Sequence, residues 1–303
     1  MVKINFNQKL LDKHIAKIPP KIETAISNID RSALSEESKR CLDYLSKKEI
    51  IENLLKADTT ALKEHIAYFT KHYPSSIEHN SKLNILLREE IFEKEYNNWG
   101  QRKKYGAYSF VESLDLKTCP YCNRNYTFVV NESDGKLRPE IDHFYPKSIY
   151  PFLAMSFFNL IPSCSICNHT KSNKIKEGLD NPYDIQKNSY RFTYRPNSID
   201  FAIVEKKKYD FNSFEIELKG NPSNIELFKL EQLYRQHKDI VLELLIKKAY
   251  YPQSYIDELS KFGFSQDEIY RYLLSNYNQD NDLHKRPLSK LVRDISEELG
   301  LLK

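Results

Sequence analysis

Apolar side chains recur at helical spacing through the first hundred residues of the chain. In LSEESKRCLDYLSKKEIIENLL, residues 34–55, one stripe carries Leu34, Cys41, Leu42 and Leu45, and SKLNILLREEIFEKEYNNW, residues 81–99, repeats the pattern. Spacings of three and four place such residues on one face of a helix. The pattern predicts helices from about residue 21 to residue 100, with Cys41 in the core.

The middle of the chain changes to β-branched and aromatic runs. YTFVV (126–130), a turn at SDGK (133–136) and LRPEID (137–142) together predict a hairpin. Further along, three more stretches have the composition of strands: YRFTYRP (190–196), FAIVEKKKY (201–209) and FEIELKG (214–220).

Helical patterns return after residue 222. Ser223 with Glu226 three positions later predicts a capping box ahead of a helix through LFKLEQLYRQHKDIVLELLIKKAY, residues 227–250. Further helices are expected around residues 254–262, 265–274 and 287–302. Seven glycines in 303 residues argue against architectures built on glycine-rich turns. The chain is therefore expected to be α+β and mainly helical, in three regions: 1–105, 106–185 and 186–303.

The formal net charge of +4 says little about partners, so a surface that binds polyanions would have to be local. Two basic clusters with neighbouring tyrosines, Arg102–Lys104 and Lys206–Lys208, are candidates for contacts with a nucleic-acid backbone, and solvated lysine runs are the alternative. Five histidines are expected to be solvated, and so is His237 on a predicted helix; the five are His14, His65, His72, His79 and His284.

No segment has the pattern of a signal peptide or a transmembrane helix. The longest apolar stretch, FLAMSFFNLI, lies between Pro151 and Pro162 and is too short to span a bilayer. A cytosolic protein without membrane contact is expected. In that compartment, paired cysteines bind metal or do redox chemistry more often than they form structural disulfides.

Four of the five cysteines form two pairs with the spacing of zinc knuckles, Cys119 with Cys122 and Cys164 with Cys167. Two such knuckles complete a tetrahedral sulfur shell for zinc. A redox pair would need only one CxxC, and buried thiols are the remaining alternative. Four sulfurs leave zinc no open position, so this ion would hold the fold and would not do chemistry.

The segment between and after the two knuckles carries polar residues that suit a second metal. Asp142 and His143 are adjacent in it, and Asn168 directly follows the last cysteine. If a helix starts near Ser165, Asn168 and Lys171 lie one turn apart on the same face. The zinc would then hold a strand that carries an acid and a histidine against the start of this helix.

The motifs CPYC, IDHFYPKS and NLIPSCSICNHTK, in this order over residues 118–175, resemble an HNH nuclease with the ββα-metal fold and a four-cysteine zinc site. More narrowly, HFYPKS, YPFLA, NLIPSC and CNxxK are similar to the HNH nucleases of Septu-type and retron-associated anti-phage systems. The resemblance implies a central ββα-metal module flanked by helical regions.

Carried over to this chain, the resemblance implies that His143 is the general base and that Asp142 binds a catalytic divalent cation. Asn159 would orient the loop around His143, and Asn168 would supply the second protein ligand. The chain departs from the family's spelling here, because asparagine stands where the last histidine is usual. His169, the next residue, could be the ligand instead.

The residue types fit phosphodiester hydrolysis independently of the resemblance. A neutral imidazole accepts a proton from water, and carboxylate and amide oxygens suit Mg²⁺ or Mn²⁺ better than zinc. Lys147 and Lys171 are candidates for phosphate contacts, each as a point charge. The zinc deaminases are excluded, because their HxE and PCxxC motifs do not occur in the chain.

The function expected from these motifs is metal-dependent cleavage of nucleic acid by an HNH endonuclease in anti-phage defence. DNA is the favoured substrate, and the resemblance implies products with a 5′-phosphate and a 3′-hydroxyl. An RNA substrate such as tRNA and a zinc-stabilised binding module without turnover are the alternatives. The resemblance also implies a partner ATPase with an ABC-like fold, and the chain itself has no Walker A motif.

Overall fold

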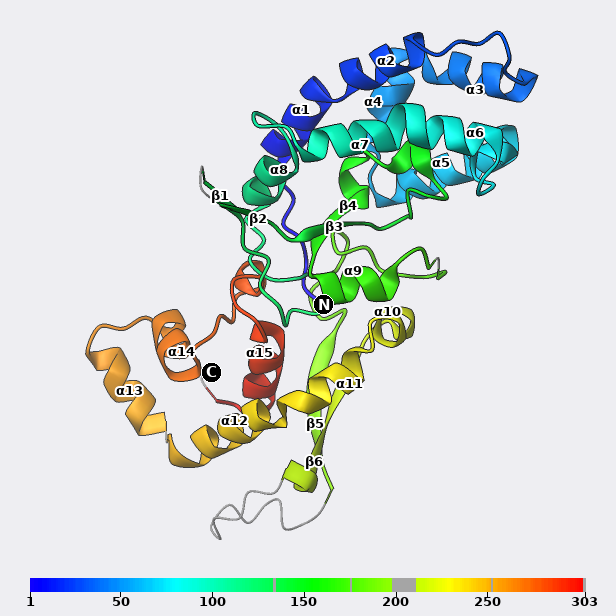
Figure 1. Ribbon diagram of the computed structural model, residues 1–303. Helices are drawn as coiled ribbons and strands as arrows, with labels where there is room; N and C mark the ends of the chain where they lie inside the picture. Colours follow the sequence, from blue (N-terminus) through cyan, green and yellow to red (C-terminus); the bar gives the residue numbers. More distant parts are fainter. Residues whose placement is uncertain (133–134, 175, 198–210, 252, 302–303) are drawn as a thin grey trace. The chain divides into compact units, whose positions relative to one another are not determined.

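The computed structural model describes residues 1–132, 135–174, 176–197, 211–251 and 253–301 (Figure 1). These residues are mainly helical and contain three two-stranded antiparallel sheets, as the expected α+β class requires. They divide into two compact units, each built from separate stretches of chain. One unit comprises Asn5–Leu116 and Thr127–Ile175; the other comprises Met1–Ile4, Lys117–Tyr126 and Lys176–Lys303. The division into regions 1–105, 106–185 and 186–303 stays a prediction.

Helices make up most of the unit that begins at Asn5, as the hydrophobic pattern predicts for residues 21–100; the helices Gln8–Lys17 and Ala107–Leu114 lie outside that predicted range. Its first eight helices are α1 (Gln8–Lys17), α2 (Pro19–Ser27), α3 (Glu36–Leu45), α4 (Lys48–Lys56), α5 (Thr59–His72), α6 (Lys82–Leu86), α7 (Glu93–Gly100) and α8 (Ala107–Leu114). Side-chain caps start several of them; the carboxylate of Asp58 accepts hydrogen bonds from the first turn of α5. Cys41 lies in the core, where burial raises the pKa of its thiol.

A π-helical turn, Leu87–Phe92, joins α6 to α7 without a break. Its apolar residues Leu87, Ile91 and Phe92 are buried, and Arg88 and Glu89 point elsewhere and line a cavity described below. Single π turns inside longer helices are rare, and they occur often at functional sites.

The predicted hairpin forms, but it is shorter than expected. β1 (Val130–Asn131) pairs with β2 (Lys136–Leu137), and part of the predicted turn lies outside the described residues. The stretch LRPEID does not continue as one strand. Its second half belongs to β3 (Glu140–His143), which pairs with β4 (Leu160–Ser163) instead. Pro139 separates the two pairings, because proline cannot donate to a strand ladder.

The β3–β4 pair carries the central polar residues of the sequence. In its register Glu140 faces Ser163 and His143 faces Leu160. β4 leads directly into Cys164, which precedes helix α9 (Ser165–Lys171), and α9 packs against β3 (Figure 1). The predicted helix start near Ser165 is confirmed.

The second unit contains the strands and helices expected after residue 190. β5 (Arg191–Pro196) and β6 (Phe214–Lys219) form one antiparallel pair, and the predicted strand 201–209 lies outside the described residues, with the Lys206–Lys208 cluster. The helices of this unit are α10 (Pro222–Leu227), α11 (Leu230–Tyr234), α12 (Lys238–Tyr250), α13 (Gln253–Lys261), α14 (Gln266–Leu274) and α15 (Ser289–Glu298). In the described ranges, no helix has both the length and the apolar character needed to cross a membrane.

Two predictions about this unit are wrong in detail. Ser223 does not cap the helix, because α10 starts one residue earlier and the side chain of Asn221 accepts a hydrogen bond from the Ser223 N–H at 2.9 Å. The single helix expected through residues 227–250 is interrupted at Lys229, which has a left-handed backbone (φ +51°) and separates α10 from α11.

His14 and His284 are buried and not solvated as expected. His14 of α1 is 0% exposed and lies among aromatic rings that include Trp99, Phe110 and Phe157. No apolar pattern marks the position, because the packing that encloses His14 comes from residues far along the chain.

Candidate metal centre and active site

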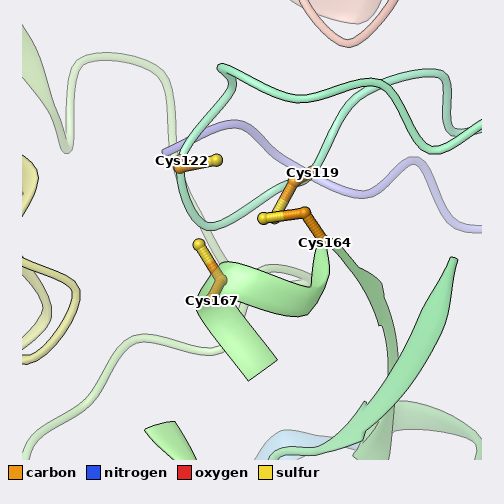
Figure 2. Close-up of side chains that lie close together, drawn as sticks. All are labelled: Cys119, Cys122, Cys164 and Cys167. Atoms are coloured by element: carbon orange, nitrogen blue, oxygen red, sulfur yellow. The ribbon is translucent and has the colours of Figure 1, made fainter. Parts of the chain in front are cut away.

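The four paired cysteines converge on one point, as Figure 2 shows. Their sulfur atoms all lie within 4.8 Å of one another, and all four residues are buried. Around a tetrahedral zinc with bonds of about 2.3 Å, neighbouring sulfurs lie roughly 3.8 Å apart. No disulfide joins them in the described structure. The cluster could therefore bind a zinc ion, with Cys119, Cys122, Cys164 and Cys167 as ligands.

Local hydrogen bonds fix the first knuckle. Asn123 has a left-handed backbone (φ +49°), and its N–H donates to the Cys119 carbonyl at 2.7 Å, which closes the turn around CPYC. The buried Asn123 side chain donates to the Thr118 hydroxyl at 2.9 Å, and the hydroxyl of Tyr234 donates to the Cys122 carbonyl at 2.6 Å. Asparagine adopts this backbone region more readily than most residues. The second knuckle is the first turn of α9.

A cavity of about 790 Å³ lies in the first unit, where β3, α9 and α7 meet. Asp142, His143 and Asn168, which the sequence predicts to act together, all line it. The rest of its lining includes residues of the π turn and of α7, among them Arg88, Glu93 and Tyr96, which the sequence did not single out.

His143, at the end of β3, has a defined tautomer. Its Nε2 lies 2.9 Å from the Ala154 carbonyl oxygen. Because a carbonyl oxygen only accepts, Nε2 carries the proton and Nδ1 does not. No described residue forms a hydrogen bond with Nδ1. Burial, and then the Lys147 ammonium, lower the pKa of His143 to about 3. The imidazole is therefore neutral at physiological pH.

Tyr96 of α7 packs against His143. The ring centroids are 4.6 Å apart in an edge-to-face arrangement, and burial raises the pKa of the Tyr96 phenol to about 12. Tyr96 thus stays protonated and supports the imidazole from the side of the helix.

Asp142 forms a buried ion pair with Lys171 of α9. The Lys171 ammonium donates to Asp142 Oδ1 at 3.0 Å and to the His143 carbonyl at 2.6 Å, and Lys171 is 0% exposed. Each charge compensates the other in a site that excludes water, so removing one would leave the second uncompensated. Lys171 does not line the cavity in the described structure. A phosphate contact by this lysine would require the ion pair to open.

Asn168 and His169 both lie next to Glu140. The Asn168 amide donates to Glu140 Oε2 at 2.6 Å, and His169 Nε2 lies 3.4 Å from Glu140 Oε1. The contact leaves the amide oxygen of Asn168 as the atom that could bind a hard cation. The sequence offered one clue to Glu140: two residues before Asp142 on a strand is the same face.

Asn159 is fully buried directly before β4 and holds the chain that follows His143. Its side-chain oxygen accepts from the Tyr145 N–H at 2.7 Å, and its amide donates to the carbonyls of Tyr145 (3.1 Å) and Leu153 (2.9 Å). These bonds hold the loop that follows His143 next to the segment that contains Leu153 and Ala154. The Ala154 carbonyl of that segment accepts the hydrogen bond from His143. The geometry is the one that an orienting role would need.

Lys147 is not free in the cavity. Its ammonium contacts a carboxylate oxygen of Glu93 and lies 5.8 Å from the centre of the Tyr96 ring. The other Glu93 oxygen lies 3.5 Å from Arg88 Nε. The cation that the sequence predicts is therefore present at the cavity, but a carboxylate neutralises it.

Two other basic candidates are engaged elsewhere. Arg102, in the predicted cluster Arg102–Lys104, forms two hydrogen bonds with Glu95 at 2.6 and 2.8 Å. His237 accepts a hydrogen bond from Arg124 Nε at 2.9 Å in the other unit. Neither partner could be predicted from sequence pattern, because both pairings depend on side-chain geometry in the folded chain.

Comparison with known proteins finds one relevant similarity. A segment of 98 residues, 32% of the chain, is 33% identical to the Septu protein PtuB of Bacillus thuringiensis. The match spans only about a third of that curated relative, 35% of its length. No family model matches the chain, and no solved structure does either. The similarity agrees with the resemblance to Septu-type proteins, and the HNH type stays a prediction.

Proposed function

We propose that the chain is a divalent-metal-dependent HNH endonuclease that hydrolyses phosphodiester bonds, with DNA as the favoured substrate. One observation carries the proposal: Asp142 and His143 of β3 and Asn168 of α9 line the same cavity. An acid, a neutral imidazole and an amide oxygen around one hollow are the donors that such hydrolysis uses.

His143 would act as the base through Nδ1. The nitrogen takes a proton from water while the water oxygen forms a bond to phosphorus. The bond from phosphorus to the 3′ oxygen then breaks, and this oxygen takes a proton from solvent. The products are a 5′-phosphate and a 3′-hydroxyl. Because Nε2 is committed to the Ala154 carbonyl, the imidazole cannot rotate without losing that bond.

Asp142 and Asn168 would hold Mg²⁺ or Mn²⁺, and both offer the hard oxygen donors that these ions prefer. When bound, the cation neutralises charge on the phosphoryl oxygens and lowers the pKa of a coordinated water. Asp142 keeps its contact with Lys171, which fixes the carboxylate in place. Glu140 positions the Asn168 amide by accepting its N–H. His169 is the alternative ligand.

The cysteine cluster would serve this site through structure. A zinc ion held by Cys164 and Cys167 fixes the first turn of α9, which carries Asn168 and Lys171. Four sulfur ligands leave such an ion closed to water and substrate.

Anti-phage defence is the biological setting that we propose, on the similarity to a Septu protein. A partner from the same defence system, an ATPase with an ABC-like fold, is the partner implied by the family resemblance.

The proposal is tested with purified wild type and His143→Ala on supercoiled plasmid and on total RNA, with and without Mg²⁺. His79→Ala, which removes an exposed histidine of the same unit, is the matched control. Cleavage of plasmid by wild type and His79→Ala, and not by His143→Ala, supports a DNA nuclease. Cleavage of RNA alone assigns the same site to RNA. Binding without cleavage, both with and without Mg²⁺, would favour the non-catalytic module.

A further inference from the structure

A network of three charged side chains lines the predicted active site: Arg88 and Glu93 come from the N-terminal helices, and Lys147 comes from the segment after β3. Glu93 is shared between Lys147 and Arg88, and Arg88 also donates to Glu89 at 2.7 Å. The side chains of Arg88, Glu93 and Lys147 are between 18% and 28% exposed. All three line the cavity that holds Asp142 and His143. The network is therefore neither a solvated surface pair nor a core ion pair.

The π turn explains how Arg88 meets Glu93. Residues five apart on an α-helix point about 140° away from each other, so they do not pair. A π turn closes its hydrogen bonds from i to i+5, and at the end of the π turn Leu87–Phe92 the Glu93 N–H donates to the Arg88 carbonyl. The irregularity in the helix thus brings a guanidinium and a carboxylate onto the same side, toward Lys147.

The cavity carries no net formal charge in this state. Three basic side chains line it, Arg88, Lys94 and Lys147, and three carboxylates balance them, those of Glu89, Glu93 and Asp142. A site for a polyanion gains affinity from unpaired cations. The basic side chains of this cavity are instead balanced by carboxylates.

We propose that Arg88 and Lys147 form a phosphate-binding subsite for the nucleic-acid backbone, and that Glu93 occupies this subsite until a phosphate displaces it. The inference rests on the proposed function and adds residues to its substrate-binding site. A guanidinium and an ammonium bind carboxylate and phosphate oxygens through the same donors. Glu93 therefore stands in for the phosphate, and the exchange keeps both cations paired.

The subsite is coupled to the base through Tyr96. The Lys147 ammonium lies over the Tyr96 ring, and the same ring packs against His143. A backbone phosphate at Arg88 and Lys147 would thus lie along the wall next to the imidazole. Arg88 and Lys147 are positioning residues in this scheme, and His143 does the chemistry.

The test measures binding without cleavage. In a His143→Ala background with no divalent cation added and no chelator, so that a structural zinc is kept, the affinity of a short duplex DNA and of an RNA of the same sequence is measured over a salt series. Glu93→Gln keeps the shape of the side chain and removes its charge. It should bind about fivefold more tightly, the factor set by one partly exposed ion pair. Arg88→Gln and Lys147→Gln should each weaken binding and lower the salt slope by about one.

Glu36→Gln is the matched control, because Glu36 also pairs with a lysine, Lys39, and does not line the cavity. It changes the net charge by the same amount. If Glu93→Gln binds no more tightly than Glu36→Gln, or if the salt slope is unchanged in Arg88→Gln and Lys147→Gln, the subsite is wrong. Absence of binding to either nucleic acid would also overturn it. Thermal unfolding of each variant checks that it folds.

The outcomes separate the subsite from the proposed function. If Glu93→Gln binds more tightly and the wild type does not cleave nucleic acid, the subsite is supported and the nuclease function is rejected. If the wild type cleaves nucleic acid and Glu93→Gln does not change the binding affinity, the nuclease function is supported and the subsite is rejected.

Discussion

The surroundings of His14 and His143 differ in one hydrogen bond. Each imidazole donates Nε2–H to a backbone carbonyl, and the two acceptors are neighbours in the chain, Met155 for His14 and Ala154 for His143. The second nitrogen of His14 accepts from the Tyr105 hydroxyl at 2.8 Å inside an aromatic core. His143 lines a cavity together with an acid and an amide, and no described residue forms a hydrogen bond with its second nitrogen. A histidine with both nitrogens paired stabilises a fold, whereas one with a nitrogen at a cavity can accept a proton.

His14 and His143 do not differ in charge. Burial lowers the pKa of His14 to about 4 and that of His143 to about 3, so both rings are neutral at physiological pH. A shifted pKa therefore does not distinguish the two. The geometry of the remaining nitrogen does.

Removal of zinc should have the largest effect. Chelation, or Cys122→Ser, should destabilise the protein by several kcal/mol, because a structural zinc site contributes folding free energy directly. Hydrogen exchange should show the largest loss of protection in α9, next to His143, and a smaller one in α1, around His14. Metal analysis should find one zinc per chain in wild type. Equal stability with and without metal would show that the cysteines are not a structural site.

His143→Ala should reduce the single-turnover rate of cleavage by about 10²–10⁴-fold, the contribution of a positioned general base. The free energy of unfolding should change much less than the activity, because one nitrogen faces a cavity. A loss of activity that is matched by a loss of folded protein would contradict the assignment.

His14→Ala should do the reverse. It leaves the Tyr105 hydroxyl and the Met155 carbonyl without their partner and opens a void in the core, at a cost of about 3 kcal/mol. Urea unfolding measures this cost, with His79→Ala as the exposed control. The folded fraction of His14→Ala should still cleave at a rate near that of wild type.

The smallest change for a single step in conditions is the pH dependence of stability, taken per unit of pH. The pKa of His14 is near 6.5 in the unfolded chain and about 4 in the folded one. Between these values the unfolded state binds more protons, so stability rises with pH there and is fully present above pH 6.5. The contribution of His14 is at most about 1.4 kcal/mol per pH unit. Urea midpoints against pH should have a shallower slope in His14→Gln than in wild type.

Much of the fold follows from local pattern. The N-terminal helices, the helix after Ser165 and the strands β5 and β6 were predictable, because amphipathic periodicity and strand composition act over short distances. The cysteine pairs and the Asp142–His143 motif were visible for a similar reason: ligand spacing is a local property. β4 was not predicted, because Pro162 is unusual inside a strand and the strand depends on its pairing with β3.

The remaining residues of the site depend on tertiary contacts. Glu93 and Arg88 form a contact because a π turn changes the register of a helix. No pattern of residues in the sequence predicts that turn. Lys171 is an ordinary lysine in the sequence, yet it is buried against Asp142. His14 is enclosed by rings that arrive from later parts of the chain. Sequence pattern therefore indicated candidate residues that line the cavity, and it did not indicate the partners Glu93 and Arg88 or the burial of Lys171.

The most direct test of the account is the nitrogen chemistry of His143, measured by long-range ¹H–¹⁵N NMR of the imidazoles at neutral pH before and after addition of Mg²⁺. The account predicts that both His14 and His143 are neutral with the proton on Nε2, and that Mg²⁺ shifts the signals of His143 and leaves those of His14 in place. A protonated Nδ1 on His143, or a His143 ring that does not respond to Mg²⁺, would contradict it.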